Sequence, residues 1–223
     1  MIILKNINDI DKSSRRRCIS IGNFDGIHQG HMQLIKNTIE IARKKNLIST
    51  ILTFDPMPEE FFDSKDFFRL MEMSDKFQIF DELGIDQVIP ILFNKDFSEI
   101  NKDDFVKDIL IHKLMIEHLI VGNDFQFGHK RQGDISLLKS YENQGLYCLT
   151  VLDLVKTSNS KVSSRDIRAL IKDGRIKDAN TMMAMPFSLS GKVIHGEKRG
   201  RELGYPTANI EICNSYRING IFL

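Results

Sequence analysis

The chain has 223 residues, of which 42% are hydrophobic and 27% are charged, and its formal net charge is +1. This composition is typical of a globular protein with one full hydrophobic core, or with one domain and part of a second. The charge balance argues against a general nucleic-acid-binding protein, and no apolar run approaches the ~18 residues of a membrane span.

Short apolar segments alternate with longer amphipathic ones over the first two-thirds of the chain. The apolar segments predict strands at 18–22, 48–54, 87–93, 118–122 and 146–151. The segments between them predict helices at about 31–45, 74–83, 103–114 and 134–143. Strands joined by helices imply an α/β fold, with a parallel sheet and helices on both faces. Ligands bind such sheets at the carboxyl ends of the strands.

The pattern changes after Leu154. Residues 156–161 are polar, and two short helices are expected at 163–173 and 175–183. Pro186 ends the helical pattern, and residues 187–193 alternate like a strand. We therefore expect a first domain over 1–186 and the beginning of a β domain over 187–223.

The three cysteines, Cys18, Cys148 and Cys213, are far apart and form no CxxC pair. This spacing predicts neither a disulfide framework nor a zinc site. The apolar run at the N-terminus has four residues, too few for a signal peptide. We expect a cytoplasmic protein with reduced thiols that acts on small molecules and binds neither nucleic acid nor a membrane. The sequence does not reveal its oligomeric state.

The densest candidate site follows the first predicted strand. Gly22, Gly26 and Gly30 allow a tight turn and a close approach to a ligand, and the first helix begins directly behind them. The N-terminus of a helix offers free N–H groups to phosphate oxygens. His28 and His31 are three residues apart, so both imidazoles can point into the same phosphate site. Neither GxGxxG nor GxxxxGK[ST] occurs, so a dinucleotide fingerprint and a P-loop lack support.

Two further segments carry suitable chemistry. Ser163 or Ser164 can cap a helix and contact phosphate, and Arg168 lies about one turn further on. Residues 121–128 mix aromatic and polar side chains at the end of the fourth strand. These side chains could hold a planar ring or serve as hydrophobic plugs of a turn.

The order of these motifs resembles that of the bifunctional prokaryotic riboflavin kinase/FAD synthetases, from Gly22 to Asn209. GNFDGIHQGH at 22–31 is similar to the adenylyltransferase signature of that family, and TFDPMP, VGNDFQFG and VSSRDIR follow in the expected order. GRELGYPTAN at 200–209 resembles the opening of the riboflavin kinase domain. The resemblance implies a Rossmann-like nucleotidyltransferase domain, followed by the start of a truncated β-barrel.

The resemblance also implies an activity: the FMN phosphate attacks the α-phosphorus of ATP, and FAD and pyrophosphate form. Mg²⁺ would be held largely by the phosphates, without a metal site built from protein side chains. The implied catalytic residues are His28, His31 and Arg168. Nucleotide contacts are implied for Gly22, Asn23, Phe24, Asp25, Gly26, Gly30, Ser163 and Ser164. Flavin contacts are implied for Asp124, Phe125 and Phe127, and Thr207 and Asn209 match kinase-domain residues.

The chain departs from the family pattern in several places. Met57 stands where histidine is common, Arg165 where threonine is usual, and Gln126 where arginine is frequent. The sequence ends fourteen residues after Asn209, before the expected catalytic glutamate of the kinase domain. We therefore expect no riboflavin kinase activity, and no independently folded unit over 187–223.

Two alternatives stay open. The same chemistry could act on another phosphorylated acceptor, such as phosphopantetheine or nicotinate mononucleotide. The protein could also be a degenerate flavin- or nucleotide-binding protein without turnover.

Overall fold

A computed structural model of the protein describes residues 1–10, 15–62, 67–153, 156–157, 160–195, 204 and 208–212. Its centre is a six-stranded sheet in the order β1-β4-β3-β2-β5-β6, in which every neighbouring pair is parallel. The strands are β1 (Ile2–Ile3), β2 (Arg17–Ile21), β3 (Ile48–Asp55), β4 (Gln87–Leu92), β5 (Ile116–Gly122) and β6 (Cys148–Leu152). The predicted parallel sheet is confirmed, with the two-residue β1 as an additional edge strand.

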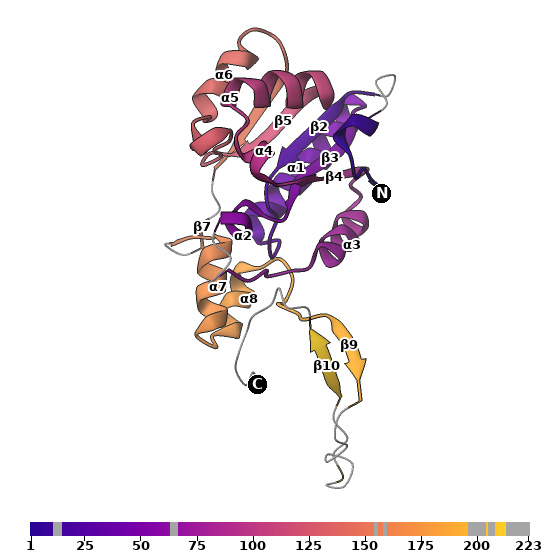
Figure 1. Cartoon of the computed structure of the whole chain (residues 1–223), viewed down its shortest axis with the longest axis vertical. Coiled ribbons are helices and arrows are strands. Elements are labelled where there is room, and N and C mark those ends of the chain that lie inside the picture. The colour runs from indigo at the N-terminus through magenta and orange to yellow at the C-terminus, as the bar shows by residue number, and fades with distance from the viewer. Residues whose placement is uncertain are drawn as a thin grey trace.

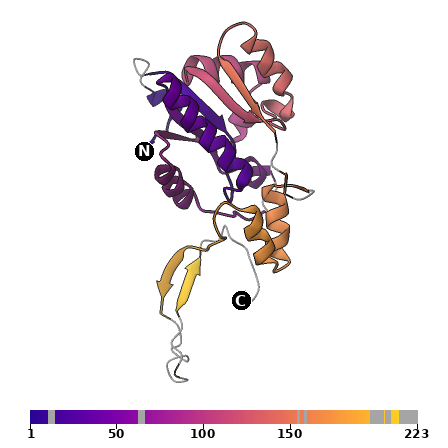
Figure 2. The same cartoon turned by 180° about the vertical axis from the view of Figure 1, so that it is seen from behind.

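Helices cover both faces of the sheet (Figures 1 and 2). On one face, α1 (Gln29–Lys45) and α3 (Met73–Leu83) bury Ile35, Ile39 and Phe80 against the sheet. On the other face, the π-helix η2 (Phe105–Lys113) and α6 (Ile135–Glu142) pack over β2 and β5, and α5 (Lys102–Asp104) directly precedes η2. The predicted helix at 103–114 is therefore present, but most of it has π-type rather than α-type hydrogen bonding.

Local signals account for where these helices begin and end. Asp134 caps α6 by accepting a hydrogen bond from the backbone N–H of Leu137. Asn46 ends α1 and Gly84 ends α3, both in the left-handed conformation (φ of 55° and 89°). Shorter pieces lie in the loops: η1 (Ile7–Asp9), α2 (Pro58–Phe62), α4 (Lys95–Ser98) and η3 (His129–Arg131).

The segment after the sheet forms a second, smaller layer at the carboxyl ends of the strands (Figure 1). It contains a short hairpin of β7 (Lys156–Thr157) and β8 (Ser160–Lys161), followed by α7 (Ser164–Lys172) and α8 (Ile176–Met182). Ile167, Ile171 and Ala179 pack against Phe68 and Leu70. The backbone N–H of Ala184 donates to the carbonyl of Ile27, 3.1 Å away. The two helices are therefore packed against the first domain.

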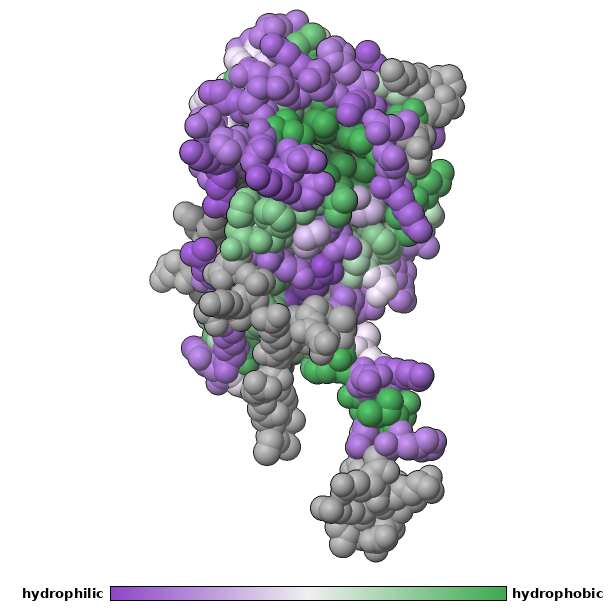
Figure 3. Space-filling view, viewed as in Figure 1, coloured by the Kyte–Doolittle hydropathy of each residue, from purple (hydrophilic) through white to green (hydrophobic). Residues whose placement is uncertain are grey.

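An antiparallel ribbon follows, formed by β9 (Gly191–Ile194) and β10 (Asn209–Ile212). All four residues of β9 are exposed, and in β10 only Ile212 is partly buried. Most of 187–223 lies outside the described residues, so the prediction for this segment as a whole is not tested. Elsewhere on the surface, hydrophobic residues gather in a hollow framed by hydrophilic ones (Figure 3).

Candidate functional site

A cavity of about 1450 Å³ lies where β2, β3, β5 and β6 end. Ile21, Gly22, Phe54, Gly122 and Leu152 line it from these strand ends. Its opposite wall comes from α7, which contributes Ser164, Arg165 and Arg168 among others. The site therefore lies at the carboxyl edge of the parallel sheet, as the sequence predicts.

His28 and His31 lie side by side in this cavity. Their rings are stacked, with centroids 3.6 Å apart and an interplanar angle of 16°. His28 caps α1, because its Nδ1 accepts a hydrogen bond from the backbone N–H of His31 at 3.3 Å. The predicted convergence of the two imidazoles on one site is thus present in the structure.

The side chain of Phe24 supports His31 from beneath. It is fully buried, its ring centroid is 5.1 Å from that of His31, and it meets Phe80 edge to face. The Nδ1 atom of His31 is also buried, and it has no hydrogen-bond partner within the described residues. Burial, then His28 and Lys76, lowers the pKa of His31 well below its usual value. Burial therefore favours the neutral form of His31, and its Nδ1 stays without a partner among the described residues.

The predicted nucleotide contacts fall into two groups, those that line the cavity and those that do not. Gly22, Asn23 and Gly30 line the cavity, as do Ser163 and Ser164 on the opposite wall. Phe24, Asp25 and Gly26 are not among the lining residues, and all three are buried. Gly26 has a φ of 76°, and a Cβ there would lie 2.9 Å from Leu70 Cδ1. These three residues shape the turn from within.

Arg168 reaches the cavity from α7 while one edge of its guanidinium is held by the protein. Its Nη2 pairs with the Asp25 carboxylate at 2.5 Å, and its Nε donates to the carbonyl of Phe68 at 2.8 Å. The Phe67 ring lies 4.3 Å from the guanidinium carbon. Ser164 donates to the backbone carbonyl of Asp25 at 2.9 Å. The N-terminal half of α7 is thus joined directly to the glycine-rich turn.

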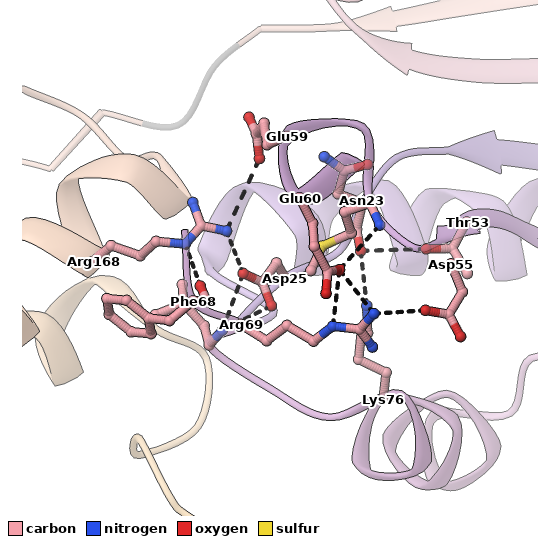
Figure 4. Close-up of polar contacts among 12 residues, drawn as sticks. Asn23, Asp25, Thr53, Asp55, Glu59, Glu60, Phe68, Arg69, Lys76 and Arg168 are labelled. Atoms are coloured by element: carbon pink, nitrogen blue, oxygen red, sulfur yellow. Dashed lines mark hydrogen bonds and ion pairs between the residues drawn. The ribbon is translucent and has the colours of Figure 1, made fainter. Parts of the chain in front are cut away.

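Figure 4 shows that Arg168 belongs to a larger charge network, made of Asp25, Asp55, Glu60, Arg69, Lys76 and Arg168. Arg69 joins Asp55 and Glu60 through contacts of 2.7 and 2.8 Å. Lys76 is fully buried, and its Nζ donates to the carbonyl of Asn23 at 3.3 Å. Burial lowers the pKa of Lys76, and the nearby Asp25 opposes that shift. The network contacts the glycine-rich turn through Lys76 at Asn23 and through Arg168 at Asp25.

Sequence reasoning missed Arg69 and Lys76. Lys76 lies in a helix where a single lysine is typical of a solvated face, and its acceptor is 53 residues away. Arg69 follows residues 63–66, which lie outside the described part, and no motif marks it. The carboxylates that pair with Arg69 gave little signal, because Asp55 and Glu60 are only partly buried, with side chains 44% and 26% exposed.

Five phenylalanines form one side of the cavity: Phe54, Phe61, Phe62, Phe93 and Phe97. We refer to this set as the aromatic wall. Phe93 contacts Phe61, Phe62 and Phe97 with ring centroids 5.5 to 5.9 Å apart, in edge-to-face arrangements. The sequence did not single out this set, because α2 has only five residues and shows no periodic pattern.

The predicted flavin contacts Asp124, Phe125 and Phe127 also line the cavity. The rings of Phe125 and Phe127 are stacked at 5.5 Å, and Phe127 contacts Phe105 at 5.2 Å. Their loop is held from below, since the N–H of His129 donates to the carbonyl of Ile100 at 2.7 Å. Planar, apolar surfaces therefore line the same cavity as His28 and His31.

The three departures from the family pattern lie in different surroundings. Met57 is fully buried and does not line the cavity, whereas Arg165 and Gln126 line it and are exposed. Thr207 lies outside the described residues. Asn209 lies in β10, where it pairs with Ile194 and is exposed.

The carboxylates that line the cavity are Glu59, Glu99, Asp124 and Asp153. No group of three His, Cys, Asp or Glu side chains placed to hold a metal ion occurs in the described part of the chain. Mg²⁺ keeps several waters and prefers phosphate oxygens with one or two carboxylates. The donor set therefore fits an ion that arrives with a nucleotide.

Comparison with known proteins gives two family matches. Residues 10–166 match the FAD synthetase family, and residues 183–223 match the riboflavin kinase family. The first match alone covers more than half of the chain. None of the described helices is both long enough and apolar enough to cross a membrane.

Several curated relatives are described as bifunctional riboflavin kinase/FMN adenylyltransferases. One from Buchnera aphidicola subsp. Schizaphis graminum is 39% identical over 221 residues, which cover 98% of this chain and 71% of that protein. One from Escherichia coli K12 is 32% identical, over 95% of this chain and 68% of that protein.

A solved structure from Streptococcus pneumoniae, described as a macrolide-efflux protein, superposes with a TM-score of 0.83 and 27% identity. The superposition covers 97% of this chain and 70% of that one.

Proposed function

This chain belongs to the FAD synthetase family, and on that basis we propose how its cavity transfers AMP from ATP to FMN. The observation that carries the proposal is that one cavity holds both phosphate-binding and ring-binding groups. His28, His31 and Arg168 line it, and so do the phenylalanines of the aromatic wall. The acceptor and the nucleotide can therefore meet within one cavity.

The groups suited to bind phosphate support transfer to an α-phosphorus. His28 and His31 can donate hydrogen bonds to phosphate oxygens, and the free N–H groups at the start of α1 add to them. Arg168 and Ser163 face the same space from α7. When bound, Mg²⁺ supplies further positive charge to the phosphates. These fixed donors stabilise the charge that develops as pyrophosphate leaves, and no covalent intermediate with the protein is needed.

The aromatic side chains that line the cavity favour a flavin as the acceptor. Phenylalanine rings offer the planar contacts that an isoalloxazine ring requires, and Phe125 and Phe127 extend the aromatic surface. Phosphopantetheine has no planar ring, so this surface argues against it as the acceptor. The presence of His28, His31 and Arg168 in one cavity argues against a protein that only binds. A cytoplasmic location is part of this proposal.

The direct test is to incubate the protein with Mg²⁺, ATP and FMN, and to measure FAD and pyrophosphate. We expect both products, and a fall in rate of at least about 100-fold for His31→Ala, because a transition-state donor is lost. His112→Ala is the matched control, since His112 is 71% exposed on η2 and does not line the cavity. No FAD from the folded protein would contradict the proposal.

The same assay with riboflavin in place of FMN tests the expectation that the chain has no riboflavin kinase activity. FMN formed from riboflavin would show that expectation to be wrong. If FMN binds but gives no pyrophosphate, the protein is a binding protein without turnover.

A further inference from the structure

Asp25 is a carboxylate with no access to the cavity. Its side chain is 1% exposed, and neither oxygen faces a lining residue other than Arg168. The backbone N–H of Leu70 donates to both oxygens, at 3.0 and 3.1 Å, and Arg168 Nη2 donates to one of them. Burial raises the pKa of Asp25, and Arg168, Lys76 and the Leu70 amide act in the opposite direction.

The arrangement fixes one edge of the Arg168 guanidinium. The Nε and Nη2 groups lie on the same edge of this planar fork, and they donate to the carbonyl of Phe68 and to Asp25 (Figure 4). No hydrogen bond from Nη1 to the described part of the chain is present. The remaining edge, formed by Nη1 and Nη2, is therefore the one left for a ligand in the cavity.

We infer that Asp25 is a positioning residue, which sets the orientation of Arg168 so that the open edge of its guanidinium faces the phosphates. This inference rests on the proposed function. An arginine side chain has many rotamers in solution, and a phosphate contact made only in the transition state gains from having the rotamer fixed in advance. Asp25 is suited to this, since its own orientation is fixed by the Leu70 amide.

The contacts around Asp25 favour this role over a purely structural one. The backbone carbonyl of Asp25 accepts from Ser164, so the same residue holds two cavity-lining side chains of α7. Phe67 covers one face of the guanidinium and limits its rotation. Glu59 is half exposed and lies 4.0 Å from Nη2, farther than Asp25 and the Phe68 carbonyl lie from their donor nitrogens. Asp25 and Phe68 therefore fix the position of Arg168 more than Glu59 does.

A double-mutant cycle tests the inference. Asp25→Asn keeps the shape of the side chain, but it places an amide N–H₂ against either the Leu70 N–H or Arg168. We expect FAD formation to slow by about 10- to 100-fold, with the KM for FMN changed less than about 2-fold. In an Arg168→Ala background, Asp25→Asn should change the rate by less than about 3-fold, since Asp25 acts through Arg168. A full additional loss in that background would overturn the inference.

Asp86→Asn serves as the control. Asp86 also accepts from a backbone N–H and a side chain, both of Ser49, but it lies beside the amino-terminal end of β4. We expect it to leave the rate unchanged. A loss in Asp86→Asn equal to that in Asp25→Asn would show that any lost carboxylate has this effect.

A spectroscopic measurement separates this inference from the proposed function. In the wild-type protein, the Arg168 side-chain Nε–H should give a slowly exchanging NMR resonance, assigned by its loss in Arg168→Ala. Asp25→Asn, or Asp25→Glu if the first variant does not fold, should shift or broaden it. This readout needs no turnover, so it stands even if no FAD forms. A rapidly exchanging Arg168 resonance in the folded wild-type protein would overturn the inference.

Discussion

His31 and His118 share an unusual state at the scale of single residues. Each has a buried Nδ1 without a hydrogen-bond partner in the described part of the chain, although His118 Nε2 contacts Thr150 Oγ1 at 2.8 Å. Burial is the main cause that lowers the pKa of each. A histidine whose pKa is lowered in the folded state binds its proton more readily when the chain unfolds.

The stability of the protein should therefore fall as pH decreases through about 6.5, the ordinary pKa of histidine. The folded-state pKa values lie below the unfolded value, so this stability is fully present above pH 6.5 and is lost below it. Between pH 7.5 and 5.5 we expect a loss on the order of 2 kcal/mol in the free energy of unfolding. Urea unfolding at several pH values measures it.

His118→Gln should remove about half of this pH dependence, whereas His112→Gln should leave it unchanged because His112 is exposed. An unchanged slope in His118→Gln would contradict the argument.

At the scale of elements, the loop after β5 depends on a close approach of two backbones. Gly128 has a φ of 71°, and a Cβ there would lie 2.8 Å from Lys102 Cα and 2.9 Å from Lys102 N. Phe127 and Gly133 exchange backbone hydrogen bonds of 2.9 and 3.0 Å across the same loop. The loop carries Asp124, Phe125 and Phe127, so its position against α5 sets the position of the aromatic surface.

We expect Gly128→Ala to destabilise the protein by on the order of 2–4 kcal/mol, through strain at a φ of 71° and ψ of 177° and through a backbone clash, and to raise the KM for FMN. Gly145→Ala is the matched control, since its φ is 75° but no atom lies within 4 Å of its added Cβ. That variant should cost about 1 kcal/mol and leave KM unchanged. Equal costs in urea unfolding would show that the Lys102 contact has no effect.

Elements with a strong periodic pattern could be predicted from the sequence. The helix predicted at about 31–45 is present as α1, which buries Ile35, Thr38, Ile39 and Ala42, and the glycine-rich turn lies at the cavity. The short elements α2 and β1 could not be predicted, because two to five residues carry no period. The aromatic wall was missed for a related reason: its members come from three separate segments that only the fold brings together.

Within the site, the residues that line the cavity were easier to predict than the residues that hold them in place. Helix N-termini and strand ends are signals that can be found in a sequence, and they predicted five residues that line the cavity: His28, His31, Ser163, Ser164 and Arg168. The motif identified Asp25 as a site residue, but the sequence did not predict that its side chain lies outside the cavity lining. A side chain directed inward depends on partners far along the chain, such as Leu70 and Arg168.

At the scale of the whole molecule, α7 completes the cavity, whereas neither α8 nor the described part of the later ribbon lines it. Among the described residues after 186, the contacts with earlier segments include Phe187 N–H to Asn180 Oδ1 and Ser190 Oγ to Asp75. The four residues of β9 are exposed. The boundary near residue 186, which stays a prediction, follows the same division.

A chain that ends at Ser190 should therefore form FAD at a rate within about 2-fold of the full chain, because every described lining residue of the cavity is retained. A chain that ends at Val162 should lose the activity, since it lacks Ser163, Ser164 and Arg168. Steady-state rates and thermal unfolding of the two shortened chains test this. A complete loss in the longer one would place part of the site beyond Ser190.

The pairing of Asp25 with Arg168 joins residues that are 143 positions apart. During synthesis the glycine-rich turn leaves the ribosome early, and its charged partner follows only after all six strands of the sheet. A nascent chain can thus pair its strands before α7 completes the cavity. We therefore expect no FAD formation from a nascent chain until translation has passed α7.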